Sequence, residues 1–260
     1  MSGYILCQTK KAEHPYFIEN ISMNIYSIEE LCYYLYHNLY LVDQTTINEE
    51  LCTWLENELK LPALAAKLRK NLGKYNDAED ILYPIFKEIN YLTYEELRIL
   101  NGQIARLNQE SIPVRQKRKG DSFVENGMYV NAIQVYRKIL ERDDLDGERE
   151  GLREQVWYNL GCAHSCLFQM EEASECFFHA YETGHSPKAL KAYLLAYRSI
   201  AGRKEYEKKL TELKVAEELK KELNEALDNF SRIPPVSVEK EEIDGMLVKI
   251  TREYHRSTGS

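Results

Sequence analysis

An internal repeat constrains the fold of this chain more than any other feature of its sequence. The segments Asn71–Leu82 (NLGKYNDAEDIL) and Glu125–Tyr136 (ENGMYVNAIQVY) carry Gly, Tyr, Ala and a large apolar residue at identical spacings. We expect the Gly to end one helix, the Tyr to pack at the turn, and the Ala to let two antiparallel helices approach closely. A recurring helical unit of this kind is typical of arrays in which each unit packs against its neighbours.

The composition favours a helical chain. Only 12 of the 260 residues are Gly and 7 are Pro, which argues against an all-β protein with its many turns. Hydrophobic residues make up 44% of the chain, enough for a core, and 19 residues are Tyr. At about 150 residues per domain, we expect one or two domains.

The charge excludes several classes of partner. The 34 Lys and Arg residues against 42 Asp and Glu give a net charge of -8, which does not suit general nucleic-acid binding. No run of apolar residues is long enough to span a membrane. Near the N-terminus the basic residues follow the apolar stretch Tyr4–Cys7, unlike those of a secretory signal. We therefore predict a cytoplasmic protein whose six cysteines are free thiols.

The first 60 residues differ from the repeats and predict a small α+β region. Two β-type runs, Tyr4–Gln8 and Tyr16–Ile18, predict a hairpin that must pack on helices to be stable. Ser27 and Glu30 fit a capping box at the start of a helix. Apolar residues at helical spacing over 47–59 predict a second helix.

The rest of the chain predicts three further regions. Over 61–110 we expect a helical pair, opened by Pro62, and a connecting helix. Over 111–230 we expect repeats that end in one long capping helix, Glu205–Phe230, whose apolar spacing is close to that of a coiled coil. Residues 231–260 combine a linker, marked by Pro234 and Pro235, with an amphipathic helix. The apolar residues of that helix are Ile243, Met246, Leu247, Ile250 and Tyr254.

The most specific motif lies between Glu154 and Pro187. It begins with Trp157, Leu160 and Gly161 in the pattern W-x2-L-G, and the later core positions are Ala173, Phe177 and Ala180. This segment resembles one complete tetratricopeptide repeat (TPR). The segment Val114–Asp144 resembles a second repeat that lacks the Trp, and Asp143–Gly151 then forms a polar insertion between the two.

The resemblance implies an all-α array of antiparallel helical pairs, a right-handed solenoid. Proteins of this family usually bind a peptide or a helix in a concave groove lined by the first helix of each pair. By resemblance the groove residues are Lys117, Asp121, Val124, Glu125, Gln155, Tyr158, Cys162, Ser165 and Cys166. Some members hold a C-terminal carboxylate in a clamp, but Asp121 stands where the clamp has Asn and would repel that carboxylate.

Two candidate metal sites are disfavoured. Cys162, Cys166, Cys176 and His179 could bind zinc, yet there is no C-x-x-C pair, and cysteines often fill small spaces between helices. Around Asp144 and Asp146 the sequence lacks the other carboxylates of a calcium loop. We expect neither a metal nor a cofactor.

A short basic cluster and the absence of catalytic motifs complete the sequence evidence. Arg115, Lys117, Arg118 and Lys119 have no interleaved aromatic residues for nucleic acid, so we expect a solvated helix face paired with nearby acids. The sequence has no phosphate-binding glycine loop, nucleophile elbow or H-E-x-x-H motif.

The sequence therefore favours a non-enzymatic adaptor that binds a protein partner. The alternative is a peptide-responsive regulator whose terminal helices transmit binding to an effector. A third hypothesis is an enzyme with its site in the N-terminal region. Homo-oligomerisation through the C-terminal helix, and whether that helix packs in cis or in trans, stay open.

Overall fold

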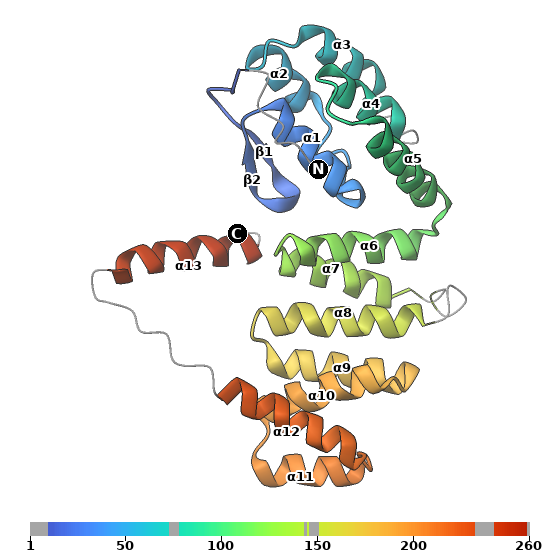
Figure 1. Ribbon diagram of the computed structural model, residues 1–260, viewed down its shortest axis with the longest axis vertical. Helices are drawn as coiled ribbons and strands as arrows, with labels where there is room; N and C mark the ends of the chain where they lie inside the picture. The colour runs from blue at the N-terminus through green and yellow to red at the C-terminus, as the bar shows by residue number, and fades with distance from the viewer. Residues whose placement is uncertain (1–9, 73–77, 143–144, 146–150, 232–241, 259–260) are drawn as a thin grey trace. The chain divides into compact units, whose positions relative to one another are not determined.

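The computed structural model describes residues 10–72, 78–142, 145, 151–231 and 242–258 (Figure 1). The chain divides into two compact units, Met1–Asn126 (unit 1) and Gly127–Ser260 (unit 2), each of which is described by itself. Both are mostly helical, and unit 1 carries a small β-hairpin, so the predicted helical class and N-terminal hairpin are confirmed. Among the described helices none is long and apolar enough to cross a membrane.

Unit 1 begins with the hairpin and continues as a series of helices. Its elements are β1 (Tyr16–Ile18), the 3-10 turn η1 (Glu19–Ile21), β2 (Met23–Ile25), α1 (Ile28–His37), the 3-10 turn η2 (Leu39–Leu41), α2 (Glu49–Asn57), α3 (Pro62–Asn71), α4 (Ala78–Glu88), α5 (Tyr94–Gln109) and α6 (Ile112–Glu125). Ser27 caps α1 as predicted, since its hydroxyl accepts a hydrogen bond from the Glu30 amide at 3.2 Å. The Glu30 carboxylate accepts instead from the Tyr26 amide, so the capping box is offset by one residue.

The pairing of the hairpin differs from the prediction. Tyr16–Ile18 pairs antiparallel with Met23–Ile25, and Tyr16 lies opposite Ile25. The predicted partner, Tyr4–Gln8, lies outside the described residues. A tight connection makes the observed pairing local, and it includes Ser22 in the left-handed conformation with φ 48°. The β2 segment is short and mostly exposed, so its sequence carries little β pattern.

The hairpin packs on the helices, as a two-stranded sheet must to be stable in water. The Tyr16 hydroxyl donates to the Thr46 carbonyl oxygen at 2.9 Å, and its ring lies 5.9 Å from the ring of Trp54. The Trp54 indole N–H in turn donates to the His14 carbonyl oxygen at 2.9 Å. Trp54 and Tyr34 are both buried and belong to the core, whereas Phe17, Tyr26 and Tyr33 are exposed.

Unit 2 consists of helices alone within the described residues. These are α7 (Tyr129–Leu140), α8 (Leu152–Cys166), α9 (Met170–Gly184), α10 (Pro187–Ile200), α11 (Arg203–Glu212), α12 (Glu217–Ser231) and α13 (Ile243–Thr258). Neighbours in sequence from α7 to α10 pack against one another (Figure 1). Of the predicted polar insertion Asp143–Gly151, only Leu145 and Gly151 lie in the described part, and Leu145 is buried.

A close approach of α8 and α9 reproduces the spacing expected from the motif. Gly161 lies within α8, and a Cβ atom built on it would lie 2.7 Å from two ring atoms of Phe177 on α9. Ala173 and Ala180 on α9 are fully buried. Only Gly at this position leaves room for the Phe177 ring, so the small residues of the motif set the distance between the two helices.

The long capping helix predicted over Glu205–Phe230 is wrong, because the structure has two helices, α11 and α12, in its place. Lys214 adopts the left-handed conformation with φ 49° and ends the first helix. The Val215 amide donates to the Leu210 carbonyl oxygen at 3.1 Å, and both side chains are buried. The apolar period continues across the break, so the sequence pattern does not reveal it.

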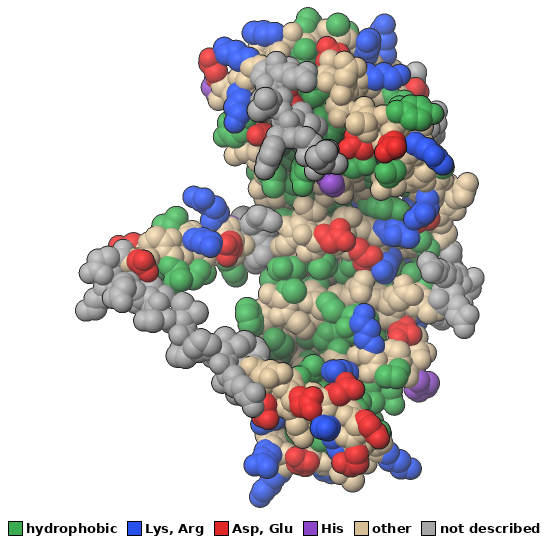
Figure 2. Space-filling view, viewed as in Figure 1, with side chains coloured by type: hydrophobic (Ala, Val, Ile, Leu, Met, Phe, Trp, Pro, Cys, Tyr) green, Lys and Arg blue, Asp and Glu red, His purple; other side chains and the backbone are tan. Residues whose placement is uncertain are grey.

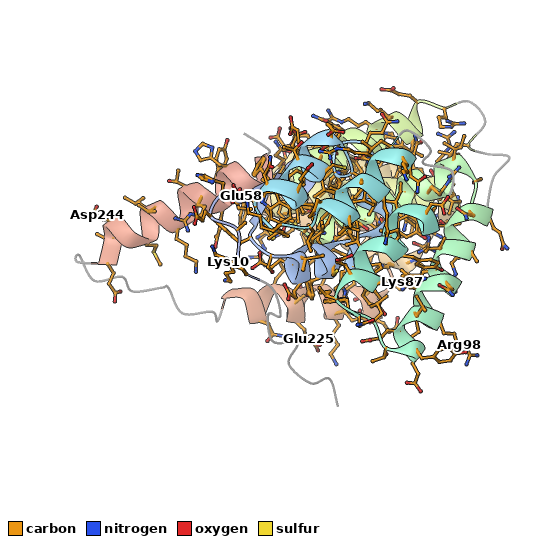
Figure 3. The ribbon with its side chains drawn as sticks, turned by 90° about the horizontal axis from the view of Figure 1, so that it is seen from above. Lys10, Glu58, Lys87, Arg98, Glu225 and Asp244 are labelled. Atoms are coloured by element: carbon orange, nitrogen blue, oxygen red, sulfur yellow. The ribbon has the colours of Figure 1, made fainter. Side chains whose placement is uncertain are left out.

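Both units carry exposed charged side chains. In the space-filling view, side chains of both signs cover α11 and α12 (Figure 2). In unit 1, the exposed Arg98 projects from α5 (Figure 3).

The apolar residues predicted on the last amphipathic helix lie on α13 and are exposed there, from 41% for Met246 to 61% for Tyr254.

Candidate functional site

The predicted groove residues fall on two helices that belong to different units. Lys117, Asp121, Val124 and Glu125 lie on α6 in unit 1, and Gln155, Tyr158, Cys162, Ser165 and Cys166 lie on α8 in unit 2. A single groove that joins the two sets stays a prediction. Each set has its own chemistry.

On α6 the charges are already paired. The Lys117 ammonium lies 2.7 Å from the Asp121 carboxylate one turn later, and both side chains are largely buried. Lys117 therefore has no free charge for a carboxylate clamp, in agreement with the argument from sequence against such a clamp. Glu125 is exposed and Val124 is half-buried.

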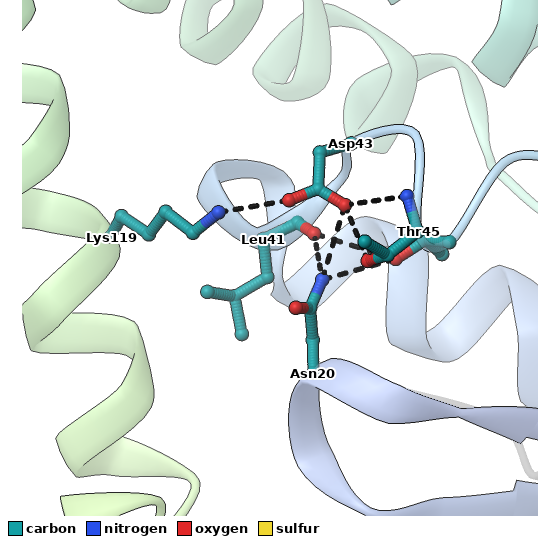
Figure 4. Close-up of polar contacts among 6 residues, drawn as sticks. Asn20, Leu41, Asp43, Thr45 and Lys119 are labelled. Carbon is teal, nitrogen blue, oxygen red and sulfur yellow. Dashed lines mark hydrogen bonds and ion pairs between the residues drawn. The ribbon is translucent and has the colours of Figure 1, made fainter. Parts of the chain in front are cut away.

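Two further members of the basic cluster, Arg118 and Lys119, are also paired with acids, which confirms the prediction for these two residues. Arg118 lies 2.7 Å from Glu110, and Lys119 lies 2.8 Å from Asp43. Asp43 also accepts hydrogen bonds from the Thr45 amide at 3.0 Å and the Thr45 hydroxyl at 2.6 Å (Figure 4). Burial by itself raises the pKa of Asp43, but the hydrogen bonds from Lys119 and Thr45 outweigh it and lower that pKa.

On α8 the candidate residues form a stripe that is partly exposed. Tyr158, Cys162 and Cys166 follow one another at intervals of one helical turn, and their exposure rises from half-buried at Tyr158 and Cys162 to exposed at Cys166. Gln155 is exposed. The Ser165 hydroxyl donates to the Gly161 carbonyl oxygen at 2.9 Å, so its donor is used within the helix. The stripe is thus aromatic and sulfur-rich.

Two contacts fix the Tyr158 ring. On its inner side the ring centroid lies 5.3 Å from that of Phe177, the same residue that packs against Gly161. On the other side the ammonium of Lys188, at the first turn of α10, lies 4.2 Å from the Tyr158 centroid. Lys188 is exposed. The core thus holds the aromatic ring, and the ammonium beside it faces water.

Two thiols of unit 2, Cys162 and Cys176, are not poised for reaction. Burial raises the pKa of Cys162, and it raises the pKa of Cys176 to about 12. The described residues contain no group of three or more His, Cys, Asp or Glu side chains arranged to hold a metal ion. The zinc alternative at Cys162, Cys166, Cys176 and His179 therefore gains no support.

Lys188 is not among the groove residues predicted from the sequence, yet it contacts the stripe. Lys188 directly follows Pro187, which begins α10, so the residue was assigned to the start of the next repeat. Tyr158 and Lys188 are 30 positions apart, four fewer than the 34 residues of one repeat, so Lys188 lies one helical turn before the position that corresponds to Tyr158. This spacing was the available signal.

No family model matches the sequence, and the chain matches neither a curated protein nor a solved structure.

Proposed function

We propose that this protein is a non-enzymatic adaptor, and that the α8 stripe with Lys188 binds a peptide or helix of a partner protein. The supporting observation is the Lys188 ammonium at 4.2 Å from the centroid of the half-buried Tyr158 ring. Aromatic rings that the core holds rigidly bind partners with little loss of side-chain entropy, and Tyr is enriched at interfaces.

The proposed array is TPR-like. Its support is the helical pair α8–α9, which ends just before Pro187, together with the close approach of Gly161 to Phe177. In such an array the first helices of successive pairs, α8 and α10, carry the binding face, and these two helices supply Tyr158 and Lys188.

The chemistry of the stripe defines the segment it would bind. An apolar side chain of the partner would contact Tyr158 and Cys162, which are half-buried and carry no charge. A carboxylate one helical turn away in the partner would pair with the exposed Lys188. We therefore expect a segment that carries Asp or Glu three or four residues from a large apolar residue.

Selection from a random peptide display library on the full chain tests this proposal. The affinities of selected peptides for the wild type and for the variants Tyr158→Ala and Lys188→Glu are then measured by fluorescence polarisation. Loss of the ring or reversal of the charge should weaken binding by about tenfold or more, as for a residue at the centre of an interface.

Phe168→Ala is the matched control. Phe168 lies at the turn between α8 and α9 with 84% of its surface exposed, so its truncation removes an aromatic ring of the same unit that follows the last turn of α8, ten residues after Tyr158. The affinity of this variant should equal that of the wild type. If the selected peptides bind Tyr158→Ala as tightly as the wild type, the stripe is not the binding site.

One observation favours the regulatory alternative as a second candidate. The apolar residues of α13 are exposed, with Leu247 at 55% and Ile250 at 53%. An amphipathic helix in this state can change its packing in cis, or pair with a second copy, when a peptide binds elsewhere. Peptide addition should then alter proteolysis of residues 231–260 or the mass measured by light scattering. If neither changes with a bound peptide, the protein is an adaptor without this regulation.

A further inference from the structure

Unit 1 contains a cavity of about 830 Å³ that lies among η2, α4, α5 and the first turn of α6. Its volume falls in the range of pockets that bind small molecules. Apolar side chains form most of its wall: Leu39, Val42, Ile81, Leu82, Ile104 and Leu107. Three of these, Ile81, Leu82 and Ile104, are at most 3% exposed, so the wall is part of the core of the unit.

The acidic group at the rim is already neutralised. Asp43 lines the cavity together with Gln44 and Thr45. One of its carboxylate oxygens accepts from the Lys119 ammonium at 2.8 Å, and the other accepts from the Thr45 amide and hydroxyl and from Asn20 (Figure 4). A cationic ligand would therefore find no unpaired carboxylate at this rim.

The basic group at the rim has no such partner. Arg115 is exposed, and among the described residues nothing forms an ion pair or a hydrogen bond with its guanidinium. Asn108, with its amide N–H donors, lines the same cavity. The rim therefore presents one uncompensated positive charge together with neutral donors, directly beside an apolar wall.

A second hollow extends the first. It has a volume of about 260 Å³ and shares Leu39, Val42, Leu107 and Arg115 with the larger cavity. Gln116 lines this hollow, and its side-chain oxygen is buried without a hydrogen-bond partner in the described part of unit 1. A buried polar atom without a partner is uncommon in folded proteins. This oxygen accepts a hydrogen bond, so a water molecule or another donor would satisfy it, whereas a carboxylate would not. Arg115 thus lies where the two hollows meet.

We propose that this cavity binds a small amphipathic carboxylate, with its apolar chain against the wall and its carboxylate on Arg115. The planar guanidinium can donate two parallel hydrogen bonds to a carboxylate. Burial of an alkyl chain in the cavity removes its apolar surface from water, which favours binding but does not fix the orientation of the ligand. The charge at the rim supplies the orientation and the preference for an anion.

Isothermal titration of the full chain with decanoate tests the proposal, and decyltrimethylammonium serves as a cation with a similar alkyl chain. We expect decanoate to bind with one site per chain and at least tenfold more tightly than the cation. Arg115→Gln should weaken decanoate binding by about tenfold or more, since a hydrogen-bonded charge pair is lost. Arg98→Gln removes an exposed Arg from α5, away from this cavity, and should leave decanoate affinity unchanged.

A second variant tests the cavity itself. Leu107 is half-buried at its wall, and Leu107→Trp should fill the space and abolish decanoate binding while the circular dichroism spectrum stays that of the wild type. Both variants should keep the affinity for peptides that bind the α8 stripe, so the two proposals can fail separately. Equal binding of decanoate and the cation, or equal decanoate affinity of Arg115→Gln and the wild type, would overturn the proposal.

Discussion

Replacement of Gly161 by Ala tests the packing of α8 on α9 with the smallest change in the chain. The added Cβ would lie 2.7 Å from Cδ1 and Cε1 of Phe177 and 3.0 Å from Cζ, closer than carbon atoms approach in proteins. The ring cannot move freely, since Phe177 is 5% exposed and contacts Tyr158 at 5.3 Å between ring centroids. The two helices must therefore separate or the ring must leave its rotamer.

The expected change in the free energy of unfolding of Gly161→Ala is the difference of two effects. Overpacking of a core by one methyl group costs about 1 to 3 kcal/mol. Ala in a helix interior is more favourable than Gly by about 0.5 to 1 kcal/mol. Because three ring atoms are affected, we place the overpacking in the upper part of its range. Gly161→Ala should then destabilise unit 2 by about 1 to 2 kcal/mol, which lowers its melting temperature by about 3 to 8 °C.

The assay is thermal unfolding followed by Trp fluorescence. The chain has two Trp residues, Trp54 in unit 1 and Trp157 on α8, so a Trp54→Phe background reports unit 2 alone. Gly102→Ala on α5 is the matched control, because nothing lies within 4 Å of its added Cβ. In a Trp157→Phe background this control should stabilise unit 1 by about 0.5 to 1 kcal/mol.

A second substitution separates overpacking from other causes. In a Phe177→Leu background the ring is gone, so Gly161→Ala should cost much less than it does in the wild type. The reasoning is refuted if Gly161→Ala is as stable as the wild type, or if its cost is the same with Leu at position 177.

Two further predictions concern the break between α11 and α12 and the Asp43 network. Lys214→Gly should stabilise unit 2 by about 0.5 to 1 kcal/mol, because Gly adopts the left-handed conformation of this residue without strain. Urea unfolding measures the change, and a less stable variant would contradict a left-handed conformation at position 214. Asp43→Asn should destabilise unit 1 at neutral pH. The pKa of Asp43 is lower in the folded protein than in the unfolded chain. The Asp43 carboxylate therefore stabilises the folded protein at pH values above its unfolded pKa of about 3.9, and this stabilisation is lost as the pH falls through its folded pKa. The stability difference between wild type and Asp43→Asn, followed by Trp54 fluorescence, should therefore shrink below about pH 4, and a difference independent of pH would show that the charge of Asp43 is not its cause.

The features that the sequence predicts well are those set by local residues. Ser27 caps α1 and Pro62 begins α3, because capping and first-turn proline depend on a few neighbouring positions. The ion pairs of the basic cluster were also expected, although their acidic partners, Asp43 and Glu110, were not identified.

Two kinds of feature are not predicted from the sequence. Some depend on contacts between segments that are far apart in the chain, and one depends on a left-handed backbone conformation at a residue other than Gly. Lys214 ends α11 in a left-handed conformation that is usually occupied by Gly, and the apolar period conceals the break. The cavity of unit 1 brings Leu39, Ile81 and Leu107 together from three elements, which no local pattern indicates. The contact of Lys188 with Tyr158 needs the stacking of α8 and α10.

The most direct test of the proposed binding face uses a thiol that the stripe itself carries. Cys166 is exposed, whereas Cys32, Cys52 and Cys176 are buried and Cys162 is half-buried. Among these five, iodoacetamide should therefore react with Cys166 first, and mass spectrometry can follow each residue separately. With a saturating selected peptide, we predict that alkylation of Cys166 slows by at least tenfold in the wild-type chain. An unchanged rate at Cys166, with the peptide shown to be bound, would contradict the central claim that α8 is the binding face.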